Sequence, residues 1–172
     1  LLIRNQTVIA QLRHLFCLIA LGVLSACGAE PKWAPQDQVD AVRFVSEEPT
    51  YITLYTVVNK STGSGAHSAI LVNGSERLIF DPAGTWYHPK LPERNDVHFG
   101  MNDKALAFYI DYHTRRTYDT IEQKVYVSPQ VAELVLARAK AYGAVPKAMC
   151  TQATSSILRG VPGFESLAQT FY

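Results

Sequence analysis

The stretch HSAILVNGSERLIFD, residues 67–81, has the pattern of two short strands joined by a turn. AILV and RLIF are rich in β-branched and large apolar residues, which favour strands, and Asn-Gly between such runs is a frequent hairpin turn. A hairpin places its two strands side by side, with alternate side chains on the same face. The stretch therefore predicts an antiparallel hairpin that begins near His67 and ends at Asp81.

The length of the turn decides whether His67 and Asp81 share a face of this hairpin. With a three-residue turn, residues 73–75, the two side chains lie opposite each other on the same face. With a two-residue Asn-Gly turn, His67 pairs with Phe80 and Asp81 faces the other side, because a slip of one residue reverses every side chain. The sequence leaves both registers open.

The segments around this hairpin predict further strands. Residues 50–58 (TYITLYTVV) are β-branched and aromatic and predict a strand, as do residues 105–113 (ALAFYIDYH) and 121–127 (IEQKVYV). Proline, glycine, asparagine and aspartate recur over residues 85–104, which predicts a long surface loop with little regular structure.

Two helices are expected near the end of the sequence. PQVAELVLARAKAYG, residues 129–143, follows Ser128, a good N-cap, and its apolar residues recur at helical spacing. A second helix is expected over residues 148–159, with Gly160 directly after it. Strands first and helices late predict an α+β fold.

The first 26 residues predict a secretory signal. Arg4 and Arg13 precede the apolar run LFCLIALGVL, which is too short to anchor the chain across a bilayer. LSAC, residues 24–27, resembles the lipobox of bacterial lipoproteins. This resemblance implies that Cys27 is lipidated and becomes the N-terminus. An ordinary signal cleaved nearby, with Cys27 incidental, is the alternative.

The lipobox resemblance also implies a location and a partner. Position 28 is Gly rather than Asp, so the inner-membrane retention signal is missing, and the outer membrane facing the periplasm is expected. Residues 27–48 begin with a polar, proline-containing stretch and predict a tether, which leaves residues 49–172 as one domain. The expected partner is the membrane, through the lipid anchor.

The composition gives no reason to expect nucleic acid or a nucleotide cofactor. The formal net charge is +1, and no run of lysine and arginine is present. No glycine-rich phosphate-binding motif occurs, and we expect no cofactor and a monomer. Hydrophobic residues make up 48% of the 172 residues, which is enough for a packed core.

Cys150 is the remaining thiol of the expected mature chain, because Cys17 leaves with the signal and Cys27 carries lipid. It lies in the first turn of the second expected helix, where backbone N–H groups and the helix dipole lower the pKa of a thiol. The same N–H groups can stabilise an oxyanion. A lone cysteine among small residues is also often a packing residue, and both interpretations stay open.

A cysteine nucleophile needs a base, and the base needs a group that orients it. His67 is the candidate base and Asp81 the candidate orienting residue. Asp81 begins the sequence DPAG, however, and a carboxylate there can instead bond the backbone of a turn.

Together these features resemble the NlpC-type papain-like cysteine hydrolases: His at a strand start, a glycine turn, a polar residue after the next strand, and Cys at a helix N-terminus. Because His67 and Asp81 precede Cys150, the order resembles the circularly permuted branch, which includes YiiX-like and lecithin:retinol acyltransferase-like proteins. The likeness covers about residues 51–160. It departs at Asp81, where many members of the superfamily carry His or Asn.

The resemblance implies a papain-like antiparallel sheet packed against helices, with Cys150 as nucleophile, His67 as base and Asp81 orienting His67. It implies acyl transfer through a thioester, on amides of cell-wall peptides or on acyl groups of lipids. An outer-membrane anchor favours the cell-wall amide. Two alternatives outside catalysis remain: a lipoprotein that binds a partner or wall fragment with an inert Cys150, and a disulfide-linked dimer.

The other histidines and several aspartates form a weaker set of candidate metal ligands. Their spacing matches no known ligand pattern, so we expect no metal. The set consists of His88, His98, His113, Asp96, Asp103 and Asp111.

Overall fold

The computed structural model describes residues 28–171. The expected signal and Cys27, the expected site of lipidation, lie outside the described residues. Within residues 28–171, each helix is too short or too polar to cross a bilayer.

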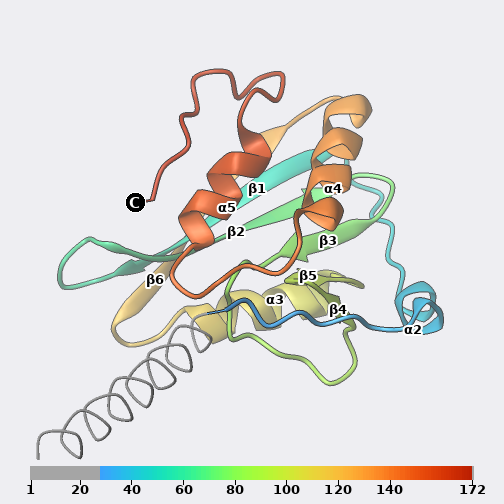
Figure 1. Cartoon of the computed structure of the whole chain (residues 1–172), viewed down its shortest axis with the longest axis horizontal. Coiled ribbons are helices and arrows are strands. Elements are labelled where there is room, and N and C mark those ends of the chain that lie inside the picture. Colours follow the sequence, from blue (N-terminus) through green and yellow to red (C-terminus); the bar gives the residue numbers. More distant parts are fainter. Residues whose placement is uncertain (1–27, 172) are drawn as a thin grey trace, which may run out of the picture.

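Six antiparallel strands form one sheet in the order β4-β5-β3-β2-β1-β6 (Figure 1). The strands are β1 (Tyr51–Asn59), β2 (Gly65–Asn73), β3 (Arg77–Phe80), β4 (Glu93–Arg94), β5 (Val97–His98) and β6 (Tyr118–Tyr126). The helices are α2 (Gln36–Ala41), α3 (Asp103–His113), α4 (Pro129–Tyr142) and α5 (Cys150–Leu158). The expected α+β class, with strands first and the cysteine in a late helix, is confirmed.

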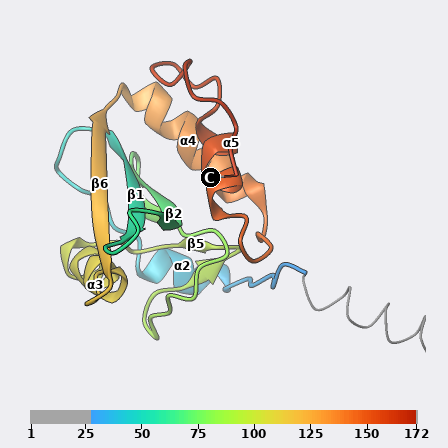
Figure 2. The same cartoon turned by 90° about the vertical axis from the view of Figure 1, so that its left-hand side faces the viewer.

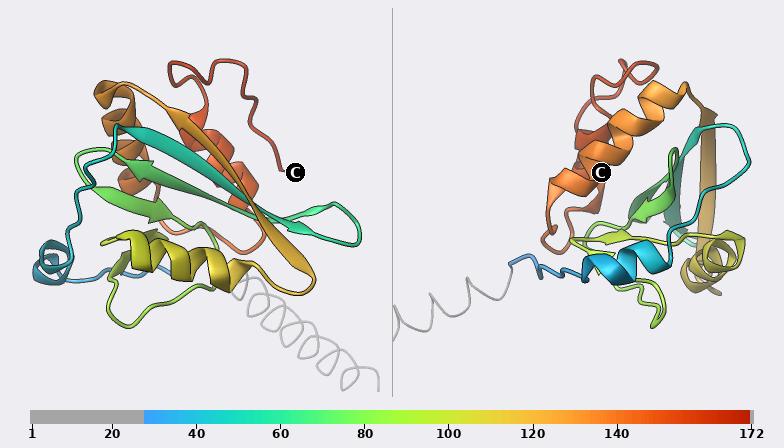
Figure 3. Two further views of the ribbon diagram at one scale, coloured as in Figure 1. Left: turned by 180° about the vertical axis from the view of Figure 1, so that it is seen from behind. Right: turned by 90° about the vertical axis from the view of Figure 1, so that its right-hand side faces the viewer.

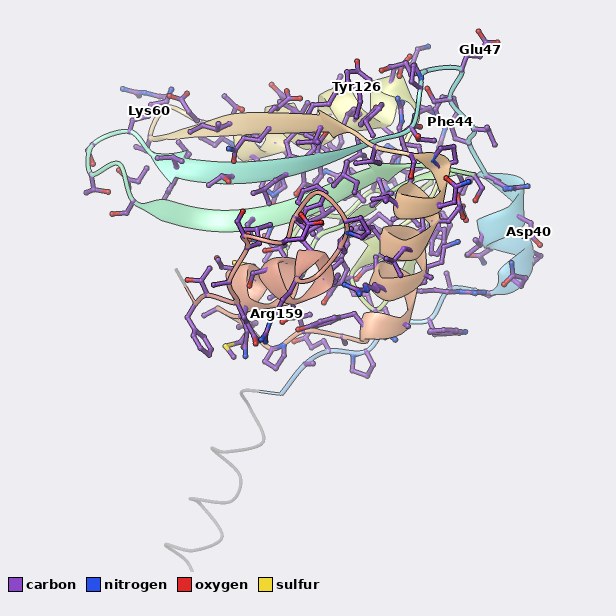
Figure 4. All side chains as sticks on the ribbon, turned by 90° about the horizontal axis from the view of Figure 1, so that it is seen from above. Asp40, Phe44, Glu47, Lys60, Tyr126 and Arg159 are labelled. Carbon is purple, nitrogen blue, oxygen red and sulfur yellow. The ribbon has the colours of Figure 1, made fainter. Side chains whose placement is uncertain are left out.

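Helices cover both faces of the sheet. Figure 2 shows α4 and α5 against one face and α3 against the other. The view along the sheet in Figure 4 gives the same two sides, with Lys60 marking the β1–β2 turn. Because side chains alternate along a strand, neighbouring residues enter different cores. Ile70 and Val72 pack on the α4–α5 side, whereas Ala69 and Leu71 pack on the α3 side.

The β2–β3 hairpin has a three-residue loop, placed one residue later than the expected 73–75. Asn73 pairs with Arg77 and Ile70 with Phe80, so the loop consists of residues 74–76. In this register Asp81 comes level with Ala69, not with His67, and the direct His67–Asp81 pairing is wrong. Because the displacement is two residues, an even number, the two side chains still share a face of the sheet, as diagonal neighbours.

Residues 105–113 form most of α3, so the strand predicted there is wrong. The side chain of Asn102 accepts a hydrogen bond from the N–H of Ala105 at 3.0 Å and caps the helix. Ala105 and Tyr109 are the buried residues of α3, and their spacing of four is helical. The aromatic content suggested a strand, but the cap and this spacing determine the structure.

The remaining predictions of elements need smaller corrections. The expected loop over residues 85–104 contains the two short strands β4 and β5. α4 is confirmed, with the Ser128 hydroxyl accepting from the N–H of Val131 at 3.4 Å. α5 begins at Cys150, two residues later than expected, so the cysteine is the first helical residue.

The segment for which the sequence predicts a tether packs against the domain from Lys32 onward. The N–H of Ala34 donates to the carbonyl of Glu93 at 3.1 Å, and Arg94 Nε donates to the carbonyl of Ala34 at 2.7 Å. Val39 of α2 is buried in the core on the α4–α5 side. Figure 3 shows this blue segment running beneath the sheet in both views.

The cap of α3 provides a test of this part of the fold. Replacing Asn102 by Ala leaves the N–H of Ala105 without its side-chain acceptor, and we expect the free energy of unfolding to fall by about 1 kcal/mol. Asn102→Asp keeps an acceptor and should retain most of the stability. Urea denaturation of the variants measures this, and equal stability of Asn102→Ala and the wild type would contradict it.

Candidate active site

Cys150 stands at the start of α5, next to an open edge of β2. Pairing between β2 and β3 stops at Ile70–Phe80, so the first half of β2 has no strand neighbour on that side. The backbone of Ser68 lies close to the Cys150 thiol there and helps to lower its pKa. The Ser68 hydroxyl also bonds the hydroxyl of Thr154 on α5, at 3.0 Å. The short β3 therefore leaves the edge of β2 free to receive α5 and its thiol.

Two further contacts hold α5 in this position. Arg138 of α4 donates to the carbonyls of Ile157 and Arg159 at 2.9 and 2.8 Å, and so satisfies the C-terminal end of α5. The buried Asp96 carboxylate accepts from the N–H of Val145, before α5, at 2.8 Å and from that of Ala83 at 3.4 Å. Asp96 thereby joins the loop that leads to Cys150 with the turn that follows Asp81.

His67 connects the thiol to Asp81. Its Nε2 lies 2.6 Å from Oδ1 of Asp81, and its ring is close enough to the Cys150 thiol for the thiol to raise the pKa of the imidazole. Because Nε2 faces the carboxylate, Nδ1 is left for the sulfur. The side chain of Asp81 is fully buried and that of His67 is 15% exposed. The structure thus brings together the three residues selected from the sequence.

The carboxylate oxygen that faces His67 is also held by a residue that the sequence did not single out. The Tyr109 hydroxyl donates to the same Oδ1 at 2.6 Å. The alternative in which the Asp81 side chain serves only the DPAG turn is wrong, because its carboxylate contacts His67 and Tyr109. The turn itself is closed by the backbone, with the N–H of Gly84 donating to the carbonyl of Asp81 at 3.1 Å.

Gly84 leaves the space that this carboxylate fills. A Cβ placed on Gly84 would lie 1.8 Å from Oδ2 of Asp81, far inside van der Waals contact. The glycine of DPAG is therefore required by the side chain of Asp81, three residues earlier, rather than by its own backbone angle.

The site lowers the pKa of the Cys150 thiol. Burial raises the pKa of Cys150, but hydrogen bonds from His67 and Ser68 and the charge on His67 outweigh it and lower the pKa to about 7. Burial lowers the pKa of His67, whereas its bonds to Asp81 and Cys150 and their charges raise it to about 10. The pKa of Asp81 is lowered by His67 despite burial. Between these values the thiolate, imidazolium and carboxylate coexist.

His113 on α3 also reaches the site. Its ring stacks on that of His67, with centroids 5.5 Å apart and an interplanar angle of 10°. His113 lies four residues after Tyr109, so both side chains project from one face of the helix. The expectation of a strand over this segment hid that relation, although the i, i+4 spacing was visible in the sequence.

The potential ligand atoms of His67, Asp81 and His113 lie within 4.8 Å of one another. None of the other five candidate ligands considered from the sequence belongs to this group in residues 28–171. The two imidazole planes are nearly parallel, and ring-nitrogen lone pairs lie in those planes, so they do not converge on a common point. The arrangement fits a stacked pair better than a metal site.

Cys150 and His67 open on a groove of about 620 Å³ between β1, β2, α5 and the C-terminal segment. Among the described residues, its lining includes no aspartate, glutamate, lysine or arginine. By contrast, a groove beside α2 of about 480 Å³ contains both acidic and basic side chains. The apolar contribution to the Cys150 groove comes mainly from Leu54, Leu158, Leu167 and Phe171.

Comparison of the chain with protein-family models, curated proteins and solved structures finds no match. The resemblance to permuted NlpC-type hydrolases therefore stays a prediction, and the functional argument rests on the geometry of the site.

The contact between Gly84 and Asp81 predicts a sensitive position. In Gly84→Ala the new methyl group displaces the carboxylate from His67, so we expect the pKa of Cys150 to rise from about 7 towards its ordinary value. The pH dependence of thiol alkylation measures this. Gly65→Ala is the control, because a Cβ there meets nothing within 4 Å. An equal midpoint in both variants would contradict the prediction.

Proposed function

We propose that this protein is a cysteine hydrolase that works by thioester acyl transfer. The observation that carries the proposal is the 2.6 Å hydrogen bond between His67 and Asp81, with the Cys150 thiol close enough to His67 for each to shift the pKa of the other, beside an open groove. A nucleophile, a base and an orienting carboxylate in this order match the requirements of covalent acyl transfer.

In the first half-reaction the Cys150 thiolate attacks the substrate carbonyl carbon. A C–S bond forms, and the carbonyl π electrons move to oxygen, where the N–H groups at the start of α5 favour the negative charge. Collapse of the intermediate breaks the bond to the leaving nitrogen or oxygen, which takes the proton from the His67 imidazolium. Asp81 stays ionised and holds the ring throughout.

In the second half-reaction neutral His67 removes a proton from water, whose oxygen attacks the thioester carbonyl. The C–S bond then breaks, the acid leaves, and the thiolate–imidazolium pair is restored. The same His67 ring gives the proton in the first half-reaction and takes one in the second. Its Nε2 must therefore stay on Asp81, and its Nδ1 must stay on the side of the reacting sulfur, through both half-reactions.

The groove favours an apolar acyl group as the substrate portion bound beside Cys150. Cell-wall stem peptides carry carboxylates, and burying one of these beside uncharged lining residues is unfavourable without a cationic partner. A hydrocarbon acyl chain needs no such partner and gains from contact with Leu54, Leu158 and Leu167. Of the two substrate classes that the resemblance implies, the lining supports lipid acyl groups over the cell-wall amide.

The non-catalytic alternative is less well supported. An inert cysteine predicts a sealed thiol or a histidine turned away, whereas Cys150 is partly exposed and lines the groove with His67, close enough for each to shift the pKa of the other. The lipid anchor at Cys27 and the outer-membrane location stay predictions. Together they would place the groove close to membrane lipid.

Alkylation by iodoacetamide across pH tests the catalytic pair. We expect folded wild-type protein to react with a midpoint near the lowered Cys150 pKa of about 7. In His67→Ala the midpoint should rise towards about 8.5, the value of an unperturbed thiol, because the base and its charge are gone. His88→Ala is the control. An unchanged midpoint in His67→Ala would overturn the proposal.

A series of p-nitrophenyl esters tests the apolar groove. We expect kcat/KM to rise about fourfold for each added CH₂ from acetate until the groove is filled, since each buried CH₂ contributes about 0.8 kcal/mol. Leu167→Ala should flatten this rise and leave the acetate rate unchanged. Leu134→Ala, equally exposed but outside the groove, is the matched control. A flat series for the wild type would contradict an acyl groove.

A further inference from the structure

α3 supplies a second layer beneath the catalytic pair. It covers the face of the sheet on which His67 and Asp81 lie, opposite to α4 and α5 (Figure 2). Two of its residues, one turn apart, reach the pair: Tyr109 bonds the Asp81 carboxylate, and His113 stacks on His67. The proposed mechanism uses neither of them directly.

The protonation of His113 is fixed by its own helix. Nδ1 of His113 lies 2.9 Å from the carbonyl oxygen of Tyr109. A carbonyl only accepts, so Nδ1 carries the hydrogen and Nε2 is left with the lone pair when the ring is neutral. The Tyr109 ring, whose centroid is 4.3 Å from that of His113, packs against it. His113 is therefore a ring with one tautomer and a fixed orientation.

The stack restricts the motion that would break the catalytic contacts. His67 needs Nε2 on Asp81 and Nδ1 on the thiol at the same time, and rotation of its ring out of plane loses both. With an interplanar angle of 10° and centroids 5.5 Å apart, the His113 ring lies parallel to that of His67 and opposes that rotation.

Resting on the function proposed above, we infer that His113 is a positioning residue for His67, holding the ring in the plane that joins Asp81 to Cys150. It acts through His67 and needs no contact with substrate.

The charged groups around His113 suit this role. His67 faces it from β2 and Asp81 from the end of β3. Tyr109 and Tyr112 of its own helix and Arg115, two residues after the helix end, lie on its other sides. Burial lowers the pKa of His113, the charges of His67 and Arg115 lower it further, and Asp81 opposes them. A neutral ring can stack on the imidazolium of His67, whereas a second cation would repel it.

The test compares His113→Ala, which removes the stacked ring, with His113→Phe, which keeps a flat ring of similar size. The readout is the pH midpoint of Cys150 alkylation in the whole protein, together with the melting temperature. We expect His113→Ala to raise the midpoint by about one unit, which makes the thiol roughly tenfold less reactive below it. His113→Phe should restore most of the shift. The native His88 ring stacks on Trp86 rather than on His67, so His88→Ala should leave the midpoint unchanged.

Other outcomes separate the possibilities. A wild-type midpoint in His113→Ala, with a lower melting temperature alone, would overturn the positioning role and leave a structural one. The same shift in His113→Phe as in His113→Ala would also overturn it. If His113→Ala does not fold, His113→Leu, which fills the space without a flat ring, takes its place. A wild-type midpoint that does not depend on His67 would instead remove the proposed function itself.

Discussion

The hydrogen bond between His67 and the buried carboxylate of Asp81 is the interaction on which the site depends. A fully buried carboxylate is stable only when paired and hydrogen-bonded, and Oδ1 of Asp81 contacts both the His67 imidazole and the Tyr109 hydroxyl. The turn after β3, the missing side chain of Gly84 and the placement of α3 all serve this one carboxylate. The paired imidazole is in turn what lowers the pKa of the thiol.

The sequence predicted the fold class and the three central residues because those features are local. The β2–β3 hairpin depends on alternation and a turn, and the start of α5 on its boundary with the preceding loop. A shift of the strand pairing by an even number of residues keeps a side chain on the same face of the sheet. His67 and Asp81 therefore share a face even though the observed pairing differs from the expected one by two residues. The direct pairing did not survive, because the loop starts after Asn73 rather than at it.

What the sequence did not predict depends on contacts between distant segments. Residues 105–113 are rich in aromatic side chains, and only their packing under the sheet shows why a helix forms there. With a strand assumed, Tyr109 and His113 had no reason to approach Asp81 and His67. The packing of residues 34–42 on the domain was hidden in the same way, because a polar, proline-containing stretch gives little sign of a buried residue such as Val39.

The positions of His67, Asp81 and Cys150 along the chain determine when during folding the site forms. His67 and Asp81 are 14 positions apart within one hairpin, so they can meet early. The contact that docks α5, between Ser68 and Thr154, spans 86 positions and closes late. An unfolded chain therefore carries an ordinary, weakly reactive thiol, and the pKa of Cys150 is lowered only when the last helix docks.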